Sequence, residues 1–167
     1  ENGRLLASAP GLAGTETTSG LVANAVVCLL DHPPQLARLR AAPELLPAAI
    51  EEVLRYRTPV QMAFRATTRD VAVDGRTIPA GRLVLLMIGA ANRDPRRFRD
   101  PSRFDVARDG PAHVGFGHGP HFCLGAALAR LEARVALGGD GPRAWRPRTG
   151  LNVHGPRALP IRLGRAR

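Results

Sequence analysis

Residues 116–125 read FGHGPHFCLG, and this glycine-rich decapeptide restricts the fold of the chain more than any other segment. Gly117 and Gly119 permit backbone conformations that other residues avoid, so a tight loop is predicted here. Cys123 comes at the start of an apolar, helix-forming run. A helix N-terminus presents unpaired N–H groups and the positive end of the helix dipole, and both stabilise an anion. Cys123 is therefore a candidate metal-binding thiolate, and Gly125 would let a flat ligand approach the backbone.

Two other interpretations of this loop are open, and a third fails. A free cysteine is often a small buried apolar group, and glycines often only form a turn. A phosphate-binding loop does not fit, because the Gly-x-Gly-x-x-Gly register that begins at Gly115 places Pro120 at its last glycine. A zinc site is the other open alternative, although structural zinc sites usually join two separated ligand pairs. Its candidate ligands lie within eleven positions and are His113, His118, His121 and Cys123.

Six positions of the decapeptide, in the pattern Phe-Gly-x-Gly-x-His-x-Cys-x-Gly, resemble the haem-binding loop of the cytochromes P450. In that family a cysteine thiolate is the axial iron ligand, and its electron donation favours O–O cleavage. The resemblance implies haem b (iron protoporphyrin IX) as the cofactor, with Cys123 as the metal ligand and His121 at a haem propionate. The other cofactor contacts that it implies within the loop are Phe116, Gly117 and Gly125.

Residues 13–18, Ala-Gly-Thr-Glu-Thr-Thr, resemble the oxygen-binding stretch of the family's long distal helix. Taken alone, such a cluster is usually a helix cap or a solvated face. The resemblance implies that Ala13 and Gly14 leave room for dioxygen above the porphyrin and contact the cofactor. Glu16 and Thr17 are the expected catalytic residues, since an acid and a hydroxyl can relay protons.

Glu52 and Arg55 stand three positions apart, so they share one face of a helix and can pair. The resemblance implies that this pair is buried and that Arg103, in a Pro-x-Arg-Phe segment, completes a structural lock beneath the haem loop. Arg65 resembles the family's second propionate-binding arginine. Substrate contacts are expected in the segment just before it, at Val60, Gln61, Met62, Ala63 and Phe64.

The composition is strongly basic. All 24 basic residues are arginine, against 14 acidic residues, and the net charge is +10. Such an excess can indicate nucleic-acid binding, but only 4% of the residues are aromatic and the arginines are scattered, so no nucleic-acid partner is expected. The resemblance implies instead that a basic face attracts an acidic ferredoxin-type electron donor served by an NAD(P)H-dependent reductase.

No membrane association is expected from the sequence. The longest apolar run, residues 21–30, is shorter than the ~20 residues that span a bilayer. No signal peptide is visible, and a cytoplasmic location is therefore expected.

Helical and strand patterns predict a mostly α chain with small β-sheets, an α+β arrangement in a single domain over residues 1–167. The resemblance implies the C-terminal part of the cytochrome P450 fold, truncated. Pro10 and Gly11 are expected to break or start the distal helix. The predicted helices are a distal helix at about 10–30, a short helix at 35–41, the Glu-x-x-Arg helix at 44–57 and a proximal helix at 123–137. A β region is predicted at 59–88, with a turn at Asp74-Gly75 and a strand at 83–88. A meander at 92–115 leads to the haem loop at 116–125, and the C-terminal strand region at 145–167 includes residues 159–163, which resemble the family's last strand.

The leading functional hypothesis is the haem-binding portion of a monooxygenase, which activates O2 and inserts one oxygen atom into a small organic substrate. A complete family member is more than twice as long, so the resemblance implies a missing N-terminal half that would cover the substrate pocket. Faces shaped for that half would expose apolar side chains and favour aggregation. One alternative is a non-catalytic haem-binding module or degenerate remnant that lacks the pocket. Another is a small basic metal or interaction domain.

Overall fold

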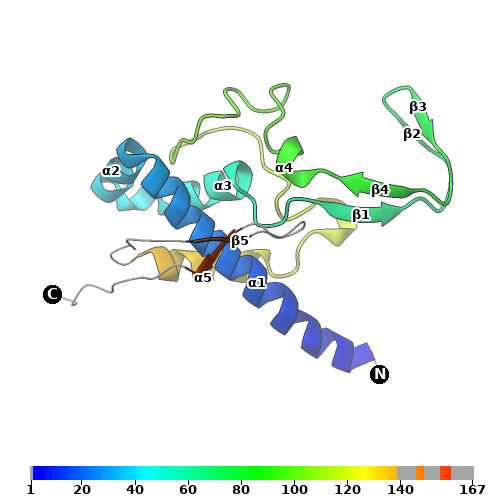
Figure 1. The fold of residues 1–167 in the computed structure, drawn as a ribbon, viewed down its shortest axis with the longest axis horizontal. Helices are drawn as coiled ribbons and strands as arrows, with labels where there is room; N and C mark the ends of the chain where they lie inside the picture. Colours follow the sequence, from blue (N-terminus) through cyan, green and yellow to red (C-terminus); the bar gives the residue numbers. More distant parts are fainter. Residues whose placement is uncertain (1, 139–145, 149–154, 159–167) are drawn as a thin grey trace.

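The fold is known from a computed structural model that describes residues 2–138, 146–148 and 155–158, with side chains described for residues 13–138. Helices come first, two small sheets and a long irregular stretch follow, and a helix then precedes a last pair of strands (Figure 1). The predicted fold class, mostly α with small β-sheets, is confirmed. Among the described helices, none combines the length and the apolar character that crossing a membrane requires.

The first helix, α1 (Asn2–Asp31), runs diagonally across the molecule in Figure 1. The prediction that Pro10 would break or start this helix is wrong, because the helix begins at Asn2 and continues through Pro10 and Gly11. A proline removes one backbone hydrogen bond, and this local cost does not end a helix whose later turns are stabilised by burial. Those turns carry the core residues Leu21 and Val27, which are 1% and 0% exposed.

Three short helices follow, with a proline at the start of each. They are α2 (Pro33–Ala41), the 3-10 helix η1 (Pro43–Leu45) and α3 (Leu46–Tyr56). Pro33, Pro43 and Pro47 stand at the first or second helical position, where the missing N–H costs nothing. The sequence predicts one helix at 35–41, which corresponds to α2, and one at 44–57, which the structure divides into η1 and α3.

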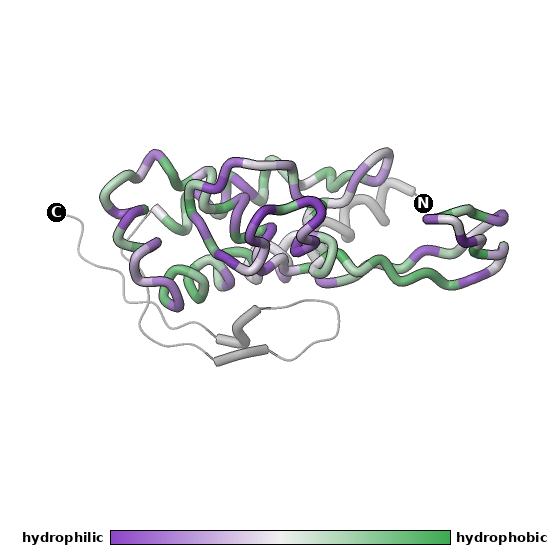
Figure 2. Tube along the Cα trace, turned by 90° about the horizontal axis from the view of Figure 1, so that it is seen from above, coloured by the Kyte–Doolittle hydropathy of each residue, from purple (hydrophilic) through white to green (hydrophobic). Residues whose placement is uncertain are grey.

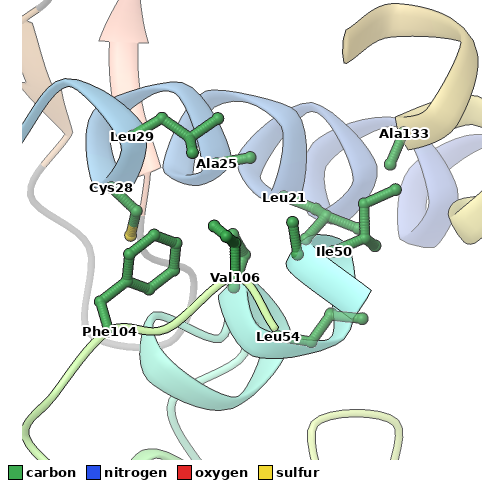
Figure 3. Packing of buried hydrophobic residues seen from close by; sticks show 11 residues of the cluster. Leu21, Ala25, Cys28, Leu29, Ile50, Leu54, Phe104, Val106 and Ala133 are labelled. Atoms are coloured by element: carbon green, nitrogen blue, oxygen red, sulfur yellow. The ribbon is translucent and has the colours of Figure 1, made fainter. Parts of the chain in front are cut away.

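The hydrophobic core joins α1 to α3 and to the meander (Figure 3). Leu21, Ala25 and Cys28 lie on one face of α1, since they are spaced by four and three residues. In Figure 3 this face meets Ile50 and Leu54 of α3. The cluster is completed by Phe104 and Val106 of the meander and by Ala133 of α5 (Ala126–Leu137). The core therefore packs α1 and α3, which precede the predicted haem loop, against α5, which follows it.

Two antiparallel strand pairs form an extended arm. Strand β1 (Ala63–Ala66) pairs with β4 (Leu83–Leu86), and β2 (Val71–Val73) pairs with β3 (Arg76–Ile78). The β2–β3 turn contains Asp74 and Gly75 with φ of +51° and +74°, the left-handed conformations that a tight hairpin turn requires. Figure 2 shows hydrophobic stretches along this arm. Leu83 is 73% exposed there, so the arm leaves apolar surface uncovered.

The remaining elements are short. Helix α4 (Ile88–Ala91) follows β4 directly, so the strand predicted over residues 83–88 ends at Leu86. The meander runs without regular secondary structure to the 3-10 helix η2 (Gly119–His121). Strands β5 (Arg146–Arg148) and β6 (Gly155–Ala158) pair antiparallel. The last strand predicted from residues 159–163 lies outside the described residues.

Candidate functional site

The glycine-rich loop closes on itself around Cys123. The Cys123 amide donates to the Phe116 carbonyl oxygen at 2.9 Å, and the Phe122 amide donates to the Gly119 carbonyl at 3.0 Å. Gly117 and Gly119 have φ of +78° and +73°, which only glycine adopts without strain. The predicted tight turn is present, and it joins the first residue of the motif directly to the cysteine.

The two cysteines occupy opposite environments. Cys123 is exposed, whereas Cys28 is buried at 1% exposure in the core. Burial raises the pKa of the Cys28 thiol to about 12, which keeps that thiol protonated and inert. Of the two, only Cys123 presents its sulfur to an external ligand.

The helix after the loop starts later than expected. The sequence predicts that it begins at Cys123, but α5 begins at Ala126 with Gly125 as its N-cap. The reason is that the Cys123 carbonyl accepts a separate turn bond from the Ala126 amide at 3.2 Å, so the chain turns before it becomes helical. Cys123 therefore lies in the turn that leads into the helix.

The four residues of the alternative zinc site do not gather. Within residues 13–138, no group of three or more His, Cys, Asp or Glu side chains is arranged to hold a metal ion. His113 is directed to α3 instead, where its Nε2 lies 3.1 Å from a carboxylate oxygen of Glu51. The loop thus offers a single cysteine rather than a cluster of ligands.

The predicted catalytic stretch lies on α1. The Thr17 hydroxyl donates to the Ala13 carbonyl oxygen one turn earlier, at 2.5 Å. Such a bond to the preceding turn is common for threonine inside a helix. Glu16 and Ala13 are exposed. A side chain added at Gly14 would meet nothing within 4 Å, so there is open space beside this helix face.

Glu52 and Arg55 form a buried, bidentate ion pair. Arg55 donates from Nε to Oε2 of Glu52 at 2.7 Å and from Nη2 to Oε1 at 2.9 Å. Arg55 also donates to the carbonyl oxygens of Asn92, Pro101 and Arg103, and in this way it fixes the meander.

The arginine that completes this lock is Arg108, and the prediction of Arg103 is wrong. Arg108 donates from Nε to Oε1 of Glu52 at 3.1 Å, and its side chain is 15% exposed. The Arg103 side chain is 63% exposed and lies 3.5 Å from Asp105 on the surface. Arg103 contributes only its carbonyl oxygen, because the meander turns its side chain outward.

Arg65, one of the two residues expected at the propionates, and the residues expected at the substrate lie on or next to β1, whereas His121 ends η2. Arg65 is exposed on this strand and donates to the neighbouring Phe64 carbonyl. Phe64 is 53% exposed. The Gln61 side chain makes a local hydrogen bond, in which its amide donates to the Thr58 carbonyl at 2.6 Å. A polar hollow of about 300 Å³ lies nearby, and Gln61 is the one predicted site residue in its lining.

Comparison with known proteins decides the family. A family model described as Cytochrome P450 matches residues 11–139, well over half of the chain. The chain belongs to the cytochrome P450 family. Its glycine-rich loop, its buried Glu52–Arg55 pair and the 13–18 stretch of α1 all fall inside the matched region.

Bacterial cytochromes P450 are among its relatives. Cytochrome P450 107B1 of Saccharopolyspora erythraea is 48% identical over 165 residues, which cover 92% of this chain and 41% of the relative. Cytochrome P450 monooxygenase PikC of Streptomyces venezuelae is 47% identical over 170 residues, which cover 93% and 40%. The chain spans about two-fifths of the length of these curated relatives.

Solved cytochrome P450 structures share the fold. P450BioI in complex with an acyl carrier protein ligated to hexadec-9Z-enoic acid matches with a TM-score of 0.84 and 43% identity, over 91% of this chain and 42% of that chain. CYP109E1 from Bacillus megaterium in complex with testosterone matches with a TM-score of 0.83 and 40% identity, over 90% and 44%.

The residues present fit the haem that the cytochrome P450 family implies. Cys123 offers an exposed thiol, a soft ligand suited to iron. Phe122 and Leu124 beside it are 52% and 98% exposed, and such apolar surface suits a flat porphyrin face. His121 and Arg65 are exposed and carry N–H groups that can bind carboxylates.

Proposed function

We propose that this chain is the haem-binding portion of a monooxygenase, with Cys123 as the axial ligand of haem b. The observation that carries the proposal is the contrast between an exposed Cys123, held in a loop closed by the Phe116 carbonyl, and a fully buried Cys28. A loop that fixes the cysteine backbone while leaving its sulfur free is what an iron-binding thiolate requires. Family membership supplies the second support.

We assign the predicted cofactor residues to three roles, namely propionate binding, the shape of the loop and space above the ring. Arg65 and His121 would bind the haem propionates through their N–H groups. Phe116 and Gly117 would shape the loop beneath the ring, and Gly125 would let the ring approach the backbone. On the other side, Ala13 and Gly14 would leave space above the ring, as the open surroundings of Gly14 support.

The proposed chemistry is oxygen insertion into a small organic substrate. When bound, a thiolate-ligated haem supplies the activation of O2. The Thr17 hydroxyl, now bonded to the Ala13 carbonyl, would hold a proton close to the cofactor, and the Glu16 carboxylate would exchange it with solvent. Apolar side chains such as Phe64 would contact the substrate, together with Val60, Gln61, Met62 and Ala63.

The proposed partners follow from the family and the charge. Electrons would pass from NAD(P)H through a reductase to an acidic ferredoxin-type donor, which the net charge of +10 would attract. The relatives are more than twice as long as the part that matches this chain. We therefore propose that turnover needs the N-terminal half that these relatives possess, which would close the substrate pocket.

The carbon monoxide difference spectrum of the haem-reconstituted, reduced chain tests this proposal. The wild-type chain and a Cys28→Ala control are expected to show the strongly red-shifted Soret band of thiolate ligation. Cys123→Ala is expected to lose that band, because the imidazoles that remain are different ligands. An unchanged spectrum in Cys123→Ala would contradict the assignment of the ligand.

A non-catalytic haem-binding module, or a remnant of the enzyme, is the second candidate. The open position of the proposed substrate residues favours it, since Phe64 is 53% exposed. The two candidates separate in a turnover assay with a ferredoxin, its reductase and NADPH. Product formation by the chain joined to the N-terminal half of a relative supports the enzyme, whereas a thiolate-type spectrum without product in that joined protein supports the module.

A further inference from the structure

The Glu51 carboxylate binds both ends of the segment that carries Cys123. From the far end, Arg130 on α5 donates from Nε to Oε1 of Glu51 at 2.6 Å and from Nη2 to Oε2 at 2.8 Å. From the near end, His113 approaches Oε2 at 3.1 Å. A single carboxylate on α3 thus receives a bidentate arginine and a histidine, one from each side of the loop.

The hydrogen bonds of His113 determine its tautomer. Its Nδ1 accepts the Gly115 amide at 3.0 Å, so Nδ1 carries no proton. In the neutral ring the proton is then on Nε2, which donates to Glu51. The His113 side chain is only 8% exposed and the Glu51 side chain is 41% exposed, so this bond lies at the edge of the protein interior. His113 therefore ties the start of the loop to the Glu51 carboxylate.

Phe116 connects this cluster to Cys123. The Arg130 guanidinium carbon lies 4.6 Å from the centroid of the Phe116 ring, a cation–π contact. The His113 ring lies 6.0 Å from the same ring. The carbonyl of Phe116 is the acceptor for the Cys123 amide. The contacts that hold the Phe116 ring and the bond that holds Cys123 thus meet in one residue.

Arg130 also holds a positive charge next to the loop. Hydrogen bonds to Glu51 are the main cause that raises the pKa of Arg130, so the group stays charged. The guanidinium is consequently a fixed positive charge against the Phe116 ring, in the residue whose carbonyl binds the Cys123 amide.

We propose that Glu51 and Arg130 form a positioning pair, which fixes the Cys123 loop through Phe116 and holds a positive charge against that residue. In this arrangement the pair acts on Cys123 through Phe116. The part of the proposal that concerns the haem rests on the function proposed above, whereas the part that concerns the loop does not.

Amide hydrogen exchange in the haem-free chain tests the positioning. Glu51→Gln and Arg130→Gln are compared with Arg134→Gln, which removes the same charge from an exposed site on α5. Exchange of the Cys123 amide is expected to rise by roughly threefold or more in the first two variants and to stay unchanged in the control. Arg130→Lys, which keeps the charge without the bidentate geometry, is expected to be intermediate. An unchanged Cys123 amide in Glu51→Gln would overturn the proposal.

The reduction potential of the reconstituted haem tests the charge. Reduction adds an electron to the site, and a nearby positive charge favours the reduced form. Arg130→Gln is therefore expected to lower the potential, and Glu51→Gln to raise it, because the arginine charge is then less neutralised. A purely structural loosening would move both variants in one direction, and that result would overturn the charge role. If the wild-type chain lacks the thiolate-type spectrum, the proposed function fails, while the exchange data still decide the positioning role.

Discussion

At the scale of single residues, the buried carboxylate of Glu52 is held by three other residues. It accepts hydrogen bonds from Arg55, from Arg108 and from the Asp105 amide. Glu52 keeps its bidentate partner Arg55 when Arg108 is removed but loses a charge-assisted hydrogen bond, so Arg108→Gln is expected to destabilise the fold by about 2 kcal/mol. Arg103→Gln, at an exposed surface pair, is expected to change stability by less than about 0.5 kcal/mol. Urea unfolding measures both, and equal losses would contradict the assignment of Arg108.

The neighbouring Glu51 gives stability a pH dependence. Burial of this carboxyl opposes the shift, but hydrogen bonds from Arg130 and His113 lower its pKa from 4.5 to about 2. A carboxyl whose pKa is lower in the folded state contributes stability above pH 4.5 that is lost as the pH falls towards 2. The difference in unfolding free energy between wild type and Glu51→Gln is therefore expected to shrink across that window. A difference that stays constant from pH 5 to pH 2 would contradict the lowered pKa.

Helix periodicity predicts that Glu52 and Arg55 can pair, and the family resemblance implied that the pair is buried. The resemblance also implied Arg103 as the third member, and no local rule shows that Arg108 is the arginine of this irregular segment that turns inward. Glu51 and Arg130 were missed for a related reason: they are far apart in sequence and meet only when α3 packs against α5. The one local signal for Glu51 is that it stands beside Glu52.

At the scale of elements, the Cys123 loop depends on two left-handed glycines. Gly119 has φ of +73° and open space around it, so an alanine there would strain the backbone without a steric clash. Gly119→Ala is expected to cost about 1–2 kcal/mol and to weaken haem retention in the reconstituted chain. Gly110→Ala is the control, because Gly110 also has open space but no positive φ, and its change is expected to stay within about 0.5 kcal/mol. Equal retention of haem in the two variants would contradict this role of the loop.

Turn chemistry made some elements predictable and left others undetermined. The β2–β3 turn was predicted from Asp74 and Gly75, which adopt the left-handed conformations that such turns need. The ends of α1 and α5 were not, because their limits depend on packing and on a turn bond from the Cys123 carbonyl. Local sequence signals therefore predicted which elements form better than they predicted the residue at which each element begins.

At the scale of the whole molecule, α5 presents an uncovered apolar face. Leu128, Leu131 and Val135 are 58%, 56% and 75% exposed, and their spacing places them on one side of the helix. We expect the chain to self-associate as its concentration rises, measured by sedimentation velocity. Changing these three residues together to Gln is expected to lower the association markedly, whereas Val73→Thr, at another exposed apolar site, should not. A wild-type chain that is monomeric at all concentrations would contradict this expectation.

The adjacent positions of Glu51 and Glu52 have a consequence for how two irregular segments are aligned. Successive side chains on an α-helix diverge by about 100°, so Glu52 reaches the Asp105 amide of the meander while Glu51 reaches His113 and Arg130 at the two ends of the Cys123 segment. Apart from the short η2, neither the meander nor the Cys123 loop has regular secondary structure that would define its place. Their positions relative to each other are set by the geometry of α3, which carries both anchors. Any rotation or translation of that helix would therefore move both segments together. A one-residue insertion ahead of Glu51 would turn both anchors away at once, while a shift of the entire helix would leave the spacing between meander and cysteine intact.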